Sequence, residues 1–161
     1  MLCPRCAATN GKAHSFECLG TLNDNKTNLF YTCPALAEEQ DDSPDAVSYY
    51  LAHFESTKPN QWIWMFDCRG IKSKDLIKSG MAKKLAETIQ KTYFDSLLGV
   101  YIVNPTLTIK TLLAFLSPFL RKETKAKIHV CSLGLIDTIN KLELAGVTKP
   151  TLSSITKKLV N

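Results

Sequence analysis

Six cysteines are the residues of this sequence most suited to chemistry, and four of them lie within the first 33 positions. Cys3 and Cys6 form a Cys-x-x-Cys pair, a spacing that allows two thiolates on a tight turn to bind one zinc ion. Cys18 and Cys33 supply two further thiols, and His14 offers an alternative ligand near Cys18 in the sequence. These residue types allow a zinc site formed by Cys3, Cys6, Cys18 and Cys33, as one of two interpretations.

The zinc site requires Cys18 and Cys33 to lie opposite each other. Residues 16–22 and 29–33 are typical of two strands, and the polar run 24–27 favours a turn. A hairpin centred there places Cys18 across from Cys33, where the pair can ligate zinc or form a disulfide in an oxidising compartment. The sequence favours the interpretation that both are small buried strand residues and that the Cys-x-x-Cys pair binds nothing. A thioredoxin-like redox site is disfavoured, because the pair does not follow a strand.

Catalytic motifs are missing from the sequence. Asp67, Cys68 and Arg69 follow an apolar run, at a position where α/β proteins often carry ligand-binding residues. No nucleophile elbow, phosphate-binding loop, paired metal-binding histidines or dinucleotide fingerprint accompanies them. We therefore interpret Asp67 as a turn or capping residue and expect no enzyme activity.

Charge is divided unevenly along the sequence. Residues 1–66 carry 4 basic and 8 acidic side chains, a net charge of −4, and residues 67–161 carry 16 and 7, a net charge of +9. The basic portion suits an anionic surface such as a phospholipid headgroup or a membrane leaflet, and a solvated lysine-rich face is the alternative. Nucleic acid is disfavoured as a partner, because no nucleic-acid-binding motif accompanies the lysines.

The candidate contacts to an anionic surface are basic residues near the ends of expected strands and helices. They are Arg69, Lys72, Arg121, Lys122, Lys125 and Lys127. Arg69 is the strongest candidate, because its planar guanidinium matches a phosphate or a carboxylate with two hydrogen bonds. For each lysine the alternative is solvent-exposed charge without a ligand.

Three apolar runs predict the strands of a buried sheet. Residues 62–66, 100–103 and 127–131 are rich in aromatic and β-branched side chains and end at polar residues, as strands covered on both faces do. Strands separated by segments of helical length favour parallel pairing with right-handed crossovers. The sequence therefore predicts an α/β fold with a mostly parallel sheet covered by helices.

The segments between these strands predict two helices. Apolar residues recur every four positions over residues 77–93, and Ser73 or Asp75 is placed to cap the start of this helix. Residues 112–120 are apolar on most faces, so this helix must be largely buried, and Pro118 limits its last turn.

Flanking segments predict further helices outside this core. An acidic connection over 34–44 precedes a helix at 44–54, which Ser43 is placed to cap. Residues 133–144 predict a helix, and residues 151–160 form a short basic tail that is weakly amphipathic.

Five segments of this α/β core form a recognisable set. They are Trp64-Met65-Phe66-Asp67-Cys68-Arg69-Gly70, Leu97-Leu98-Gly99-Val100-Tyr101-Ile102-Val103-Asn104-Pro105, Ile109-Lys110-Thr111-Leu112-Leu113, Pro118-Phe119-Leu120 and Lys127-Ile128. Together they resemble the CRAL-TRIO lipid-binding family. The resemblance covers roughly residues 28–156 and is closer to the BCH-type domains found beside Rho GTPase-activating domains than to the phosphatidylinositol-transfer branch.

The resemblance implies a lipid-binding groove or small cavity beside one face of the sheet. Its expected lining comes from alternate strand residues and the helix over 109–120, and consists of Trp64, Phe66, Tyr101, Val103, Phe115 and Phe119. Plain hydrophobic core is the alternative for these residues. The Pro-Glu-Tyr-Gly-Gly motif and gate helix of the phosphatidylinositol-transfer branch are not recognisable, nor is its N-terminal helical companion domain.

Length and composition predict one domain, residues 28–161, preceded by a cysteine-bearing extension over residues 1–27 that includes the first hairpin strand. The leading function is non-enzymatic binding of a lipid, or of a membrane surface that carries phosphoinositides. The alternative is a BCH-like interaction module that binds a small GTPase, its regulator or a second copy of itself. No signal peptide or membrane-length apolar run is recognisable, which predicts a cytoplasmic protein that is peripheral at membranes in the lipid-binding case.

Overall fold

A computed structural model of the chain describes residues 3–9, 13–37, 46–71 and 79–160. Its helices and strands in chain order are α1 (Pro4–Ala8), β1 (Phe16–Thr21), β2 (Asn28–Thr32), the 3-10 helix η1 (Pro34–Leu36), α2 (Ala46–Glu55), β3 (Trp62–Asp67), α3 (Ser79–Thr88), the π-helix η3 (Ile89–Tyr93), β4 (Leu97–Val103), α4 (Leu107–Leu116), the 3-10 helix η4 (Ser117–Phe119), α5 (Lys122–Ala126), β5 (Ile128–Cys131), α6 (Leu135–Leu144) and α7 (Lys149–Val160). Ser43, Ser73 and Asp75, the three expected helix caps, lie outside the described residues.

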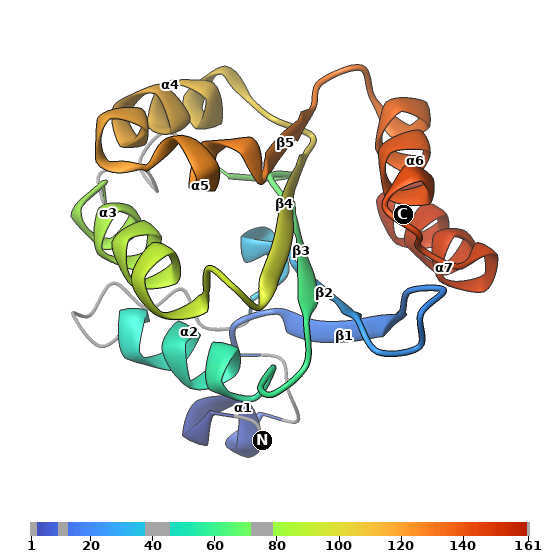
Figure 1. Ribbon diagram of the computed structural model, residues 1–161, viewed down its shortest axis with the longest axis horizontal. Coiled ribbons are helices and arrows are strands. Elements are labelled where there is room, and N and C mark those ends of the chain that lie inside the picture. Colours follow the sequence, from blue (N-terminus) through green and yellow to red (C-terminus); the bar gives the residue numbers. More distant parts are fainter. Residues whose placement is uncertain (1–2, 10–12, 38–45, 72–78, 161) are drawn as a thin grey trace.

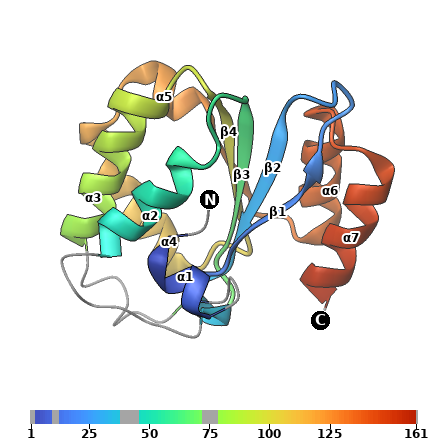
Figure 2. The same ribbon diagram turned by 90° about the horizontal axis from the view of Figure 1, so that it is seen from below.

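The five strands form one sheet in the order β1-β2-β3-β4-β5, antiparallel between β1 and β2 and parallel elsewhere. Because each parallel crossover is right-handed and moves one strand further in the same direction, the helices between β2 and β5 all fall on one face. Figures 1 and 2 show α2, α3, α4 and α5 on this face and α6 and α7 on the other. The prediction of an α/β fold with a mostly parallel, helix-covered sheet is confirmed.

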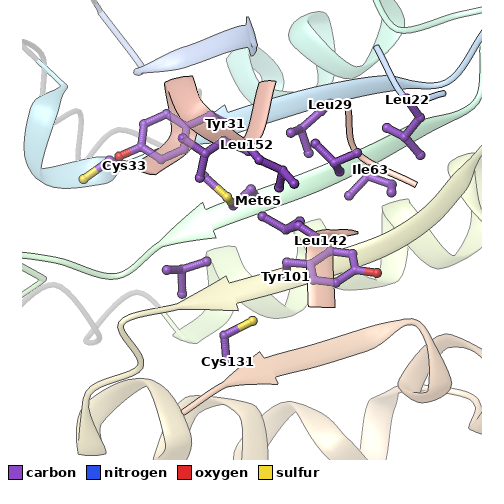
Figure 3. Close-up of a cluster of buried hydrophobic side chains, with 13 residues drawn as sticks. Leu22, Leu29, Tyr31, Cys33, Ile63, Met65, Tyr101, Cys131, Leu142 and Leu152 are labelled. Atoms are coloured by element: carbon purple, nitrogen blue, oxygen red, sulfur yellow. The ribbon is translucent and has the colours of Figure 1, made fainter. Parts of the chain in front are cut away.

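The central strand β3 has its side chains buried on both faces, as its unbroken apolar run predicts. Trp62 and Trp64 point toward α2 and α3, where they meet Phe54 and Tyr93. The alternate residues of the strand point to the opposite face. That face packs against α6 and α7 (Figure 3).

The core beneath α6 and α7 is formed by hydrophobic side chains of these helices and of the sheet. Leu142, Leu152 and Ile155 of the helices are almost fully buried. Gly20 of β1 allows α7 to approach closely, because a Cβ atom there would lie 2.8 Å from the Thr151 hydroxyl oxygen. Residues 151–160, the expected basic tail, belong to α7. This helix begins before residue 151 and includes Pro150 in its first turn, where proline is tolerated.

A buried carboxylate at the end of β3 joins several elements. Asp67 is fully buried and pairs with Arg69, whose Nε lies 2.7 Å from Asp67 Oδ2. Tyr31 of β2 donates its hydroxyl hydrogen to Asp67 over 2.9 Å, and the Asn104 side-chain amide, just after β4, donates over 3.0 Å. The Asp67 carboxylate also accepts a hydrogen bond from the Arg69 backbone N–H. The carboxylate thereby holds the ends of three neighbouring strands together.

The Arg69 guanidinium extends this network to the last turn of α7. Nη2 donates to the Lys158 carbonyl over 2.7 Å, and Nη1 donates to the Leu159 carbonyl over 3.3 Å. A cation at a helix C-terminus satisfies carbonyls that lack partners within the helix and interacts favourably with the helix dipole. Arg69 therefore fastens α7 to the sheet.

Replacing Arg69 with alanine is expected to lower the free energy of unfolding by about 2–4 kcal/mol, because it leaves the Asp67 carboxylate buried without its cation. Urea unfolding followed by tryptophan fluorescence measures this change. The matched control is Lys157→Ala on the exposed side of α7, which should stay within about 0.5 kcal/mol of the unmodified protein. Equal stability of the two variants would contradict the structural role of Arg69.

Candidate functional site

The predicted lipid-pocket residues divide between the two faces of the sheet. Trp64 and Phe66 of β3 point toward the helices α2 to α5. Tyr101 and Val103 of β4 point toward α6 and α7. In the parallel ladder Tyr101 pairs with Met65, and paired residues share a face, so Tyr101 cannot lie on the same side as Trp64. The expectation that alternate residues of the two strands line one groove is therefore wrong.

The four strand residues of the expected lining have well-packed surroundings. The Trp64 indole N–H donates to the Thr32 hydroxyl oxygen over 2.9 Å, beneath Phe54. Tyr101 stacks on His129 with ring centroids 4.7 Å apart, and burial raises the pKa of its hydroxyl. Trp64, Tyr101 and Val103 are thus buried in the core, and Phe66 packs at its edge.

The remaining two lining candidates, Phe115 and Phe119, lie on the outer side of α4 and η4. Phe115 is 46% exposed and Phe119 is 37% exposed, and their ring centroids are 5.7 Å apart. Leu107, which is eight positions before Phe115 and so on the same side of the helix, is 80% exposed. The inner side of α4 packs on the sheet through Ile109 and Leu113. The helix is apolar on both sides, as the sequence predicts, but its outer side is not buried.

Lysines accompany this outer side, and Lys83 of α3 places its Nζ 3.9 Å from the centroid of the Phe119 ring. Lys110 is exposed on α4 one turn after Leu107, and Lys122 and Lys125 are exposed on α5, which begins three residues after Phe119. We call the exposed surface formed by Leu107, Lys110, Phe115, Phe119, Lys122 and Lys125 the α4 face. It combines apolar side chains with cations, both of which an anionic lipid surface attracts.

Two other predicted anion ligands have their charged groups engaged within the protein. Lys127 Nζ donates to the carbonyl of Phe94 over 2.5 Å and to that of Leu97 over 2.8 Å, and burial lowers its pKa. Arg121 Nη2 donates to the carbonyl of Gln90 over 2.6 Å. Arg121 thereby links the start of α5 to η3. Lys127 links the start of β5 to the connection before β4 and to the first residue of β4.

The strongest sequence candidate, Arg69, is also engaged, since its guanidinium contacts Asp67 and the end of α7. Lys72 lies outside the described residues. Of the predicted contacts within the described residues, Arg121, Lys122 and Lys125 are exposed, and we assign Lys122 and Lys125 to the α4 face.

The structure brings together a different set of metal-ligating residues from the predicted one. Phe16 pairs with Thr32, so Cys18 lies opposite Phe30 rather than Cys33, and a bulge follows between Cys18 and Gly20. The hairpin was predicted correctly, but its register was wrong.

As a result of this register Cys18 is exposed, and Cys33 is buried in the core under α6 and α7. Cys3 and Cys6 instead meet His14 and His53. Burial raises the pKa of the Cys6 thiol, and burial together with nearby His14 lowers the pKa of His53 to about 4. No spacing signal identifies His53, because it follows Cys6 by 47 positions and reaches the cluster only through the packing of α2.

Comparison with known proteins identifies the family. The family model described as the CRAL/TRIO domain matches residues 29–144, so the chain belongs to the CRAL-TRIO domain family. Domains of this family bind lipids. No match is found among the curated proteins.

The fold is similar to that of a solved structure described as "Crystal structure of Sfh5". The two share 18% sequence identity with a TM-score of 0.55, over 73% of this chain and 47% of that chain. The chain thus spans about half the length of this solved neighbour. In the described part of the chain, no helix is both long and apolar enough to cross a membrane.

Replacing Lys127 with alanine is expected to lower the free energy of unfolding by about 1–2 kcal/mol, because two charge-assisted hydrogen bonds are lost. Lys125→Ala, two residues earlier and exposed, should leave the stability within about 0.5 kcal/mol of the unmodified protein. Urea unfolding of the two variants makes the comparison. A Lys127 variant as stable as the Lys125 variant would show that the Lys127 amine has no structural role.

Proposed function

We propose that this chain is a non-enzymatic lipid-binding domain that attaches to an anionic membrane surface through the α4 face. The observation that supports this most strongly is the exposure of Leu107, Phe115 and Phe119 on α4 and η4, which the exposed Lys122 and Lys125 of α5 follow in the chain. Large apolar side chains on a protein surface mark an interaction site when they gather in one patch. The adjacent lysines favour a partner that carries negative charge, such as a leaflet containing phosphatidylserine or phosphoinositides.

The energies of the two contributions indicate how such binding would behave. Burying a Leu or Phe side chain completely gives roughly 1.5–3 kcal/mol, and these three are only partly exposed, so their insertion contributes about 3–5 kcal/mol. Each lysine near an anionic leaflet adds about 1 kcal/mol. Neither contribution alone gives stable attachment, so binding should be reversible and should weaken as salt concentration rises.

Vesicle cosedimentation tests the proposal. Vesicles of phosphatidylcholine with phosphatidylserine and phosphatidylinositol bisphosphate should bind the protein at least about tenfold more tightly than pure phosphatidylcholine vesicles, since the exposed lysines of the α4 face each add about 1 kcal/mol on an anionic leaflet. The double variant Lys122→Glu, Lys125→Glu should lose this preference. The double variant Leu107→Ala, Phe115→Ala should weaken binding to both kinds of vesicle, because it removes the inserted side chains.

Two control variants test whether these effects are specific to the α4 face. Lys157→Glu removes an exposed lysine on α7, and Leu36→Ala removes an apolar side chain that is 60% exposed on η1. Both should bind vesicles like the unmodified protein. Equal binding to anionic and neutral vesicles, or an effect of the controls as large as that of the α4 variants, would contradict the proposal.

A second candidate function is contact with another protein, and it is supported by an apolar stripe on the opposite side of the molecule. Leu133, Ile136 and Leu144 are 84%, 76% and 89% exposed on and just before α6. Asn140 and Glu143 are the exposed polar residues among them. A stripe beside a carboxylate suits a protein partner better than an anionic membrane, and a second copy of the chain is the simplest such partner.

Light scattering coupled to size-exclusion chromatography tests this second candidate. A dimer that forms with rising protein concentration and is abolished by Ile136→Glu would support contact between two α6 stripes. The matched control is Leu107→Glu, which places the same charge on the α4 face and should leave the dimer intact. A monomer at every concentration up to about 1 mM, the upper range of weak specific association, would exclude self-association through α6.

A further inference from the structure

Four buried metal-ligating side chains converge at the N-terminus, away from the α4 face. Cys3 caps the start of α1, Cys6 lies within that helix, His14 lies in the turn before β1, and His53 lies on α2. All four are at most 4% exposed, and their ligand atoms lie within 4.8 Å of one another. Three separate segments of the chain thus bring two sulfur and two nitrogen ligands to one point.

Four of the six distances between these atoms are close to the edges of a tetrahedron around a zinc ion. With the usual Zn–S and Zn–N bond lengths, a sulfur and a nitrogen ligand lie about 3.6 Å apart and two nitrogen ligands about 3.3 Å apart. His14 Nδ1 lies 3.3 Å from Cys3 Sγ and 3.5 Å from Cys6 Sγ. His53 Nε2 lies 3.3 Å from Cys6 Sγ and 3.3 Å from His14 Nδ1.

Hydrogen bonding alone does not account for this arrangement. His14 Nδ1 is within 3.5 Å of three atoms, Cys3 Sγ, Cys6 Sγ and His53 Nε2, whereas a ring nitrogen makes one directed hydrogen bond in the plane of its ring. Four ligand atoms that all lie within 4.8 Å of one another are instead the arrangement expected around a shared metal ion. The Cys6 backbone N–H also donates to Cys3 Sγ over 3.3 Å, as expected for a thiolate held by a tight turn.

We propose that Cys3, Cys6, His14 and His53 bind one structural zinc ion. Two thiolates and two imidazoles form a donor set that suits zinc, and four protein ligands complete its tetrahedral coordination. Since all four ligands are buried and no position is left for water or substrate, the ion has a structural and not a catalytic role.

The packing around the four ligands shows what the ion would do. Cys3, Cys6 and Ala13 form a small hydrophobic cluster, with Tyr49 and Ala52 of α2 packed against it. Cys3, Cys6 and Ala13 have small side chains that bury little apolar area, so they contribute little to holding α1 in place. Zinc would supply this stability by linking α1 and His14 to α2, which covers the aromatic core beside β3.

Metal analysis of the purified full chain tests the proposal. Elemental mass spectrometry should find one zinc per chain, and native mass spectrometry should show a gain of about 63 Da over the denatured mass, since zinc replaces two thiol protons. Cys6→Ser and His53→Ala should each lose the zinc. Cys18→Ser is the matched control, because this cysteine is exposed and outside the cluster, and it should retain one zinc per chain. A metal-free protein, or a 2 Da loss from a disulfide between Cys3 and Cys6, would overturn the proposal.

A titration of the unmodified protein keeps the proposal testable if the ligand variants fail to fold. After the metal is removed with a chelator, cobalt(II) should bind one ion per chain and give the intense visible absorption of a tetrahedral site with two sulfur ligands. Added zinc should displace the cobalt and abolish this absorption. Cobalt that binds only with the pale spectrum of an octahedral ion would overturn the proposal. Vesicle binding through the α4 face is measured separately, so the two proposals can fail independently.

Discussion

The buried ion pair between Asp67 and Arg69 is the interaction on which the arrangement of the molecule depends. A carboxylate without access to water needs a cation and hydrogen-bond donors. Here Arg69 supplies the cation, and Tyr31 of β2 and Asn104 just after β4 donate hydrogen bonds. Because Arg69 also binds the last carbonyls of α7, the same pair closes one face of the sheet with the C-terminal helices. Arg69, which the sequence favours as a ligand for phosphate, therefore has a structural role.

The packing of helices on both faces of the sheet determines which apolar side chains stay exposed. The face under α6 and α7 is filled by a hydrophobic core, and the strand residues of the opposite face pack against α2, α3 and α4. The apolar side chains that remain accessible in the basic portion include those of the α4 face, Leu107, Phe115 and Phe119, and those of the α6 stripe. For a member of the CRAL-TRIO family, whose domains bind lipids, this arrangement favours attachment to a lipid surface.

Much of the fold could be predicted because its signals are local. The three core strands are apolar runs, and the helices between them have apolar residues at helical spacing. Side-chain positions that depend on pairing register could not be predicted. The register of β1 and β2 separates Cys18 from Cys33, and the register of β3 and β4 separates Trp64 from Tyr101. His53 joins Cys3 and Cys6 only after α2 has packed on the sheet, which sequence spacing does not record.

Hydrogen–deuterium exchange with and without anionic vesicles tests the central claim most directly. The account predicts that vesicles slow exchange over residues 107–126, which include the α4 face, and leave residues 133–144 of the α6 stripe unchanged. Exchange that is unchanged over 107–126 while the protein is bound to vesicles, or slowed only over 133–144, would contradict attachment through α4.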